Sequence, residues 1–71
     1  MKTRKVEFKD LKVGDKVLIT GNETGSENKI GEIGVISEID EKIKNFRVNV
    51  KGRKPFANWT IHIDVKLIIK E

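Results

Sequence analysis

The sequence predicts a single all-β domain, a small and strongly bent barrel of five strands. Its apolar residues are mostly β-branched, with ten Ile and seven Val against three Leu, and this bias favours strands over helices. Glycines stand inside or beside the apolar runs, where a missing Cβ permits a sharp bend. The runs are short, the connections between them are polar, and neither a long helix nor a repeat is apparent.

The size of the chain limits how it can be stabilised. With 71 residues and no Cys, it lies near the lower limit for one domain and depends on a compact core, because no disulfide is available. We expect residues 1–7 to be a flexible basic lead-in and residues 8–71 to form the domain. No apolar run approaches the roughly 20 residues that span a membrane, and no signal peptide is visible. A cytoplasmic protein without membrane contact is therefore expected.

The first half of the chain contains two predicted strands. A turn around Phe8–Asp15 leads into the first strand, Lys16–Thr20. The next segment, Gly21–Lys29, has no apolar side chain, so we expect a solvated, mobile loop. The second strand is Gly31–Asp40, in which Gly34 permits a bend or a close backbone approach.

The second half supplies three further strands after a charged hairpin. Phe46–Val50 alternates most clearly, with apolar side chains facing inward and polar ones outward. Phe56–Ile61 is the next strand, a single turn follows at His62–Val65, and Lys66–Ile69 is the terminal strand. The inward positions of all strands predict one core, made of Val17, Ile19, Ile36, Ile39, Phe46, Val48, Val50, Ile61 and Ile68.

Three segments resemble the KOW motif. They read Gly14-Asp15-x-Val17-x-Ile19-x-Gly21, Gly31-x-x-Gly34-x-Ile36-x-x-Ile39 and Arg47-Val-x-Val50. Trp59 followed by Asp64-Val-Lys-Leu-Ile68 is similar to the closing strands of small bacterial and phage-encoded barrels. KOW domains occur in ribosomal proteins and transcription elongation factors, so the resemblance implies a Src-homology-3-like barrel and an association with nucleic acid.

The charge distribution indicates where nucleic acid would bind. Fifteen basic and 11 acidic residues give a net charge of +4, and residues 42–54 contain no acid. Positive charge next to aromatic rings is typical of surfaces that hold RNA or single-stranded DNA, with weak, salt-dependent affinity. The candidate nucleic-acid-binding residues are Arg47, Lys51, Arg53, Lys54, Phe56 and Trp59.

Other interpretations of this surface stay open. Outward Lys and Arg also protect a sheet from edge pairing, so the basic face can be merely solvated, with Phe56 and Trp59 in the core. The sequence favours a non-enzymatic, nucleic-acid-associated binding module, and the alternative is a protein-interaction module, or a phage or mobile-element accessory module, without nucleic-acid contact. A peptide groove would then use Gly21–Lys29, Asp40–Asn45 and Trp59. Both a monomer and a weak homo-oligomer fit the sequence.

The sequence does not predict an enzyme. His62 is the only His, Cys is absent, and no Ser or Thr stands in a nucleophile motif. The glycines of residues 21–34 lack the spacing of a phosphate-binding loop. Neither Asp40–Glu41 nor Glu23 with Glu27 has the ligand pattern of a calcium loop. We therefore expect no catalytic residue, no metal and no cofactor.

Overall fold

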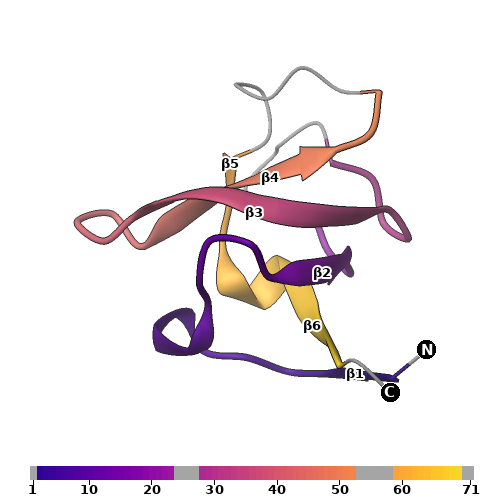
Figure 1. Ribbon diagram of the computed structural model, residues 1–71, viewed down its shortest axis with the longest axis horizontal. Helices are drawn as coiled ribbons and strands as arrows, with labels where there is room; N and C mark the ends of the chain where they lie inside the picture. The colour runs from indigo at the N-terminus through magenta and orange to yellow at the C-terminus, as the bar shows by residue number, and fades with distance from the viewer. Residues whose placement is uncertain (1, 24–27, 53–58, 70–71) are drawn as a thin grey trace.

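The computed structural model describes residues 2–23, 28–52 and 59–69, which form one antiparallel sheet and two short 3-10 turns. The turns are η1 (Phe8–Asp10) and η3 (His62–Asp64). The strands are β1 (Lys2–Arg4), β2 (Lys16–Ile19), β3 (Ile33–Asp40), β4 (Asn45–Val50), β5 (Trp59–Thr60) and β6 (Val65–Ile69). They lie in the order β1-β6-β2-β3-β4-β5 (Figure 1). The prediction of an all-β fold is confirmed.

The sheet is open and has six strands, whereas the sequence predicts five in a barrel. Its edges are β1 and β5, which do not pair with each other. The additional strand is β1, in which Thr3 lies opposite Ile68 of β6. Lys2–Arg4 contains no apolar residue, so hydrophobic alternation could not reveal a strand there. Residues Lys2–Arg4 form a strand because their backbone pairs with that of β6.

Two local features bend the sheet around its core. Gly34 lies opposite Val17 on one side and Val50 on the other, so its missing side chain lets the backbones approach. Farther along β3, Ile36 pairs with Val48 and Glu38 with Arg47, which leaves Ser37 as an extra, bulged residue. Figure 1 shows β3 crossing the molecule, with β5 and β6 running at a steep angle to it.

The bulge explains an odd spacing in the sequence. Ile36 and Ile39 are three residues apart, yet a regular strand places inward side chains at even spacing. The extra residue at Ser37 shifts the phase, so that Ile36 is buried and Ile39 packs on the core opposite Phe46. The Ile36-x-x-Ile39 spacing therefore has a direct structural cause in this chain.

The core confirms most of the predicted inward positions. Its buried members are Val6, Leu11, Val17, Ile19, Ile36, Phe46, Val48, Val50 and Val65. The prediction is wrong for Ile61 and Ile68, which are half-buried and outside this cluster. In β6 the side chains of Val65 and Leu67 face the core. Ile68 is the next residue along the strand, so its side chain points to the opposite face.

The two 3-10 turns lie in connections between strands, η1 between β1 and β2 and η3 between β5 and β6. The turn predicted at His62–Val65 is confirmed as η3, which leads directly into β6. In η1, the Asp10 carboxylate accepts a hydrogen bond from the Glu7 N–H at 3.2 Å. The described residues include no helix that is long and apolar enough to cross a membrane.

Candidate nucleic-acid interface

Strand pairing brings Glu38, Arg47 and Trp59 together on the outer face of the sheet. Arg47 lies opposite Glu38 of β3 and opposite Trp59 of β5. Its guanidinium carbon is 4.7 Å from the centroid of the Trp59 ring. Its Nη1 is 3.4 Å from Oε2 of Glu38, and 23% of the Arg47 side chain is exposed. The guanidinium thus lies over the ring, with Nη1 facing a carboxylate.

This arrangement changes the expected role of Arg47, which the sequence placed as a free outward cation. The charge is shared with Glu38, and the Arg47 Nε is buried without a hydrogen-bond partner in the described part of the chain. Because the Glu38 side chain is 56% exposed, solvent weakens the ion pair to about 0–1 kcal/mol. Another anion can therefore replace Glu38 at the guanidinium at small energetic cost.

The structure places the other predicted residues less closely together. Trp59 is half-buried and lies outside the core cluster, so its ring belongs to the outer face. Lys51 is exposed in the turn that follows β4 and makes no ion pair among the described residues. The remaining three candidates, Arg53, Lys54 and Phe56, lie outside the described residues.

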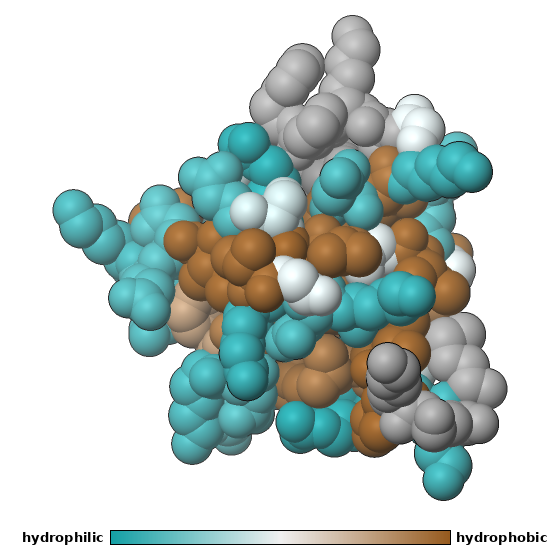
Figure 2. All heavy atoms as spheres, viewed as in Figure 1, coloured by the Kyte–Doolittle hydropathy of each residue, from teal (hydrophilic) through white to brown (hydrophobic). Residues whose placement is uncertain are grey.

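An apolar strip next to this cluster was not recognised in the sequence. It consists of Leu18, Ile33 and Val35, in which Leu18 lies opposite Ile33. Ile33 is 43% and Val35 39% exposed. Figure 2 shows hydrophobic side chains across the middle of the face that β3 presents, with hydrophilic side chains around them. The sequence does contain a signal for the strip. Ile33 and Val35 alternate with Gly34 and Ile36, which are buried, so the first two side chains must point to the opposite, outer face.

The charges around the strip are predominantly positive. Lys16 lies opposite Val35, and Lys51 follows the end of β4. Two acids occupy outward positions of β3, and both are engaged. Glu38 faces Arg47, while Oδ1 of Asp40 accepts hydrogen bonds from the N–H groups of the following turn, that of residue 42 at 3.0 Å. The face can thus offer apolar contact and free cations to the same ligand.

The segment predicted as a solvated loop is partly anchored. The Glu23 N–H donates to Oδ1 of Asp64 at 3.2 Å, and the Gly21 N–H donates to the Asp64 carbonyl at 3.1 Å. Asn28 is only 1% exposed, which contradicts the expectation that the whole segment is solvated. Its polar side chain is buried, and hydrophobic patterning cannot predict such a position. Residues 24–27 lie outside the described part.

The proposed peptide groove does not take the expected form. A pocket does lie beside the 40–45 hairpin, but its walls come from η1 and the end of β3, including Phe8, Leu11 and Ile39. Neither Trp59 nor any described residue of Gly21–Lys29 lines this pocket. Within residues 2–23, 28–52 and 59–69, no group of three or more His, Cys, Asp or Glu side chains is placed to hold a metal ion.

The chain matches no protein-family model, no curated protein and no solved structure. Its function must therefore be argued from its own geometry.

Proposed function

We propose that this protein is a non-enzymatic binding module that holds single-stranded nucleic acid against the outer face of β2, β3 and β4. The observation that carries the proposal is the stack of Arg47 on Trp59 beside an exposed apolar strip. Proteins that bind single strands combine cations along the backbone with rings or apolar surface under the bases. A duplex hides its base faces, so an apolar strip favours a single strand.

The individual side chains have distinct proposed roles. A phosphate replaces Glu38 at the Arg47 guanidinium, because the two anions compete for the same donor edge. Lys16 and Lys51 contact further phosphates on either side of the strip. A base packs against Val35 and the Trp59 edge. With about three phosphate contacts, a dissociation constant near micromolar or weaker is expected at physiological salt.

The relation to known folds is also a proposal. We propose that the sheet is an opened relative of Src-homology-3-like barrels of the KOW type. The features that support it are the bulged and bent β3 strand and the 3-10 turn before the last strand. A protein-interaction or phage accessory module without nucleic-acid contact is the alternative, and the binding experiment separates the two.

Fluorescence anisotropy with labelled oligo-dT and oligo-U tests the proposed function. Binding should weaken steeply between 50 and 200 mM salt, because affinity comes from counterion release. Lys16→Gln combined with Lys51→Gln should reduce the slope of log K against log salt by about 1.4, because each single-strand phosphate contact contributes about 0.7. Lys12→Gln combined with Lys42→Gln is the matched control, since both residues are exposed and neither belongs to the face.

The outcomes separate the two candidate functions. If the control pair flattens the slope as much as the face pair, the binding is diffuse and the assigned face is wrong. If neither oligonucleotide binds at 50 mM salt, nucleic-acid binding is refuted and the protein-interaction module takes first place. Equal affinity for a duplex of the same length would contradict the role of the apolar strip.

A further inference from the structure

A second pocket lies away from the Arg47–Trp59 cluster, where four parts of the chain meet. It has a volume of about 450 Å³, within the range of pockets that hold small ligands. Its walls come from the segment after β1, the end of β2, η3 and the start of β6. The lining residues are Lys5, Val6, Thr20, His62, Ile63, Val65 and Lys66.

The polar lining of this pocket can carry only positive or neutral charge. Its polar lining consists of Lys5, Thr20, His62 and Lys66, and no acidic residue among the described residues lines it. None of these four side chains takes part in an ion pair or side-chain hydrogen bond in the described part of the chain. The donors are therefore available to a ligand, and their charge is not neutralised by the protein.

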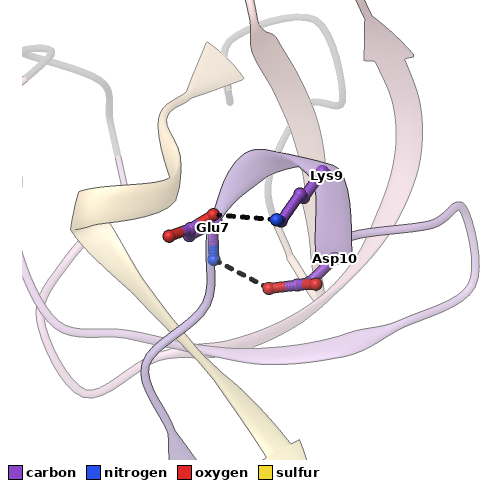
Figure 3. A network of polar contacts seen from close by, with 3 residues as sticks. All are labelled: Glu7, Lys9 and Asp10. Atoms are coloured by element: carbon purple, nitrogen blue, oxygen red, sulfur yellow. Dashed lines mark hydrogen bonds and ion pairs between the residues drawn. The ribbon is translucent and has the colours of Figure 1, made fainter.

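The acids near the pocket are already engaged. Asp64 of η3 lies in the chain between the lining residues Ile63 and Val65, but it is buried, and its Oδ1 accepts the Glu23 N–H at 3.2 Å. Glu7 and Asp10 lie at the rim, where His62 also lines the surface. Figure 3 shows that the Glu7 carboxylate faces the Lys9 ammonium, at 3.6 Å, and that Asp10 accepts the Glu7 N–H. Lys9 and Lys44 add further positive charge next to His62. The titratable groups around the imidazole are thus mainly cationic.

The rest of the pocket is apolar. Val6 and Val65 are buried in its wall, while Ile63 is 54% exposed at the mouth. Apolar walls lower the local dielectric constant and so strengthen the attraction between a cation and an anion. They also offer contact to an organic group attached to that anion. Charge and shape together specify an anionic ligand with an apolar portion.

We propose that this pocket binds the phosphate of a phosphomonoester, with Lys5, His62 and Lys66 around the anion and Ile63 against its organic group. The site adjoins the proposed nucleic-acid interface, because Lys66 lies opposite Leu18 of the apolar strip, but it uses neither Arg47 nor Trp59 and does not depend on nucleic-acid binding there. The phosphate can belong to a free small molecule or to the end of a nucleic acid. In both cases the imidazolium form of His62 binds the anion more tightly than the neutral form.

The only His of the chain reports directly on this site. Sulfate is a suitable first probe, because it keeps its double negative charge between pH 5 and 8, where imidazole groups titrate. Sulfate bound beside the imidazole should shift the NMR signals of the His62 ring saturably at a fixed pH. Sodium chloride at equal ionic strength is the reference.

Variants connect the shift to the pocket. Lys66→Gln should weaken sulfate binding about tenfold and reduce the shift measured at a fixed sulfate concentration. Lys42→Gln removes the same charge outside the pocket and should leave both unchanged. A His62 ring signal that moves no more in sulfate than in chloride would overturn the proposal, as would equal effects of the two variants.

A second comparison identifies the source of the phosphate. Phenyl phosphate should bind more tightly than inorganic phosphate if Ile63 contacts the organic group. If a 5′-phosphorylated dinucleotide perturbs His62 more strongly than phenyl phosphate, the site accepts a nucleic-acid end; the reverse order assigns a free small molecule. If inorganic phosphate matches or exceeds both esters, the phosphomonoester assignment is wrong. These results are independent of oligo-dT binding at Trp59, so either proposal can fail without the other.

Discussion

Replacing Gly34 with Ala should destabilise the protein strongly, although it adds a single methyl group. A Cβ built on Gly34 would overlap Cγ1 of Val48, and it would lie 2.9 Å from Cγ2 of Val50 and 3.0 Å from the carbonyl oxygen of Asn49. Overpacking a core in this way costs about 1–3 kcal/mol. The whole domain is expected to have only about 5–10 kcal/mol of stability, so the loss should be easily visible in urea denaturation.

A second substitution tests the cause of this loss. Val48→Ala alone should cost about 1–3 kcal/mol, because it removes buried methyl groups. It also removes the atom that the new Cβ would overlap. Gly34→Ala should therefore cost less in the Val48→Ala background than in the wild type, by about 1 kcal/mol. The relief should be partial, since the Asn49 carbonyl belongs to the backbone and cannot move away as a side chain can.

Three results would refute this reasoning. A denaturation midpoint of Gly34→Ala that equals the wild type would mean that the β3–β4 spacing is wider than described. An unchanged midpoint of Val48→Ala would mean that the phase of β4 is wrong. Strict additivity of the two substitutions would mean that Val48 is not the residue that excludes a side chain at Gly34.

Two further predictions concern polar contacts. Glu38→Gln should raise affinity for oligo-dT about two- to fivefold at low salt, because phosphate no longer competes with a carboxylate for Arg47; anisotropy measures this change. Asp64→Ala should cost about 1–3 kcal/mol and accelerate hydrogen exchange at the Glu23 amide, which donates to the Asp64 carboxylate. Asp64→Asn should keep most of the protection, since its Oδ1 can still accept.

Each of these predictions has a defined contrary result. Glu41→Gln removes the same charge from an exposed turn residue. If it raises oligo-dT affinity as much as Glu38→Gln, the effect is one of net charge and the competition at Arg47 is wrong. If the Glu23 amide exchanges at the same rate in Asp64→Ala and in the wild type, Asp64 does not anchor the segment that follows β2.

Hydrophobic patterning predicts the central strand β4 well, because several apolar residues in this strand indicate the same inward face. Phe46, Val48 and Val50 alternate with polar residues, so only one phase of β4 was possible. The terminal strand lacked this contrast, since Leu67, Ile68 and Ile69 are apolar in both phases. The inward position was therefore assigned to Ile68 although Leu67 occupies it. The β1 strand gave no hydrophobic signal at all.

The candidate interface was less accessible to sequence analysis than the core. Arg47 and Trp59 were recognised as residue types, but their contact depends on the register between β4 and β5. The pairing of Arg47 with Glu38 depends also on the extra residue at Ser37. Such a bulge moves every following partner by one position. The spacing of Ile36 and Ile39 marks the irregularity, but it does not show which residue of β4 lies opposite each residue of β3. Long-range register is thus the missing information.

The intrinsic fluorescence of Trp59 tests the central claim most directly, because it is the only Trp of the chain and lies in the proposed interface. Titration with unlabelled oligo-dT at 50 mM salt should change its emission saturably, since a base packs beside the ring. At 200 mM salt the midpoint of this titration should lie at about a 20-fold higher oligo-dT concentration. An emission spectrum that stays constant at saturating oligo-dT would contradict the assignment of the β2–β4 outer face as a nucleic-acid interface.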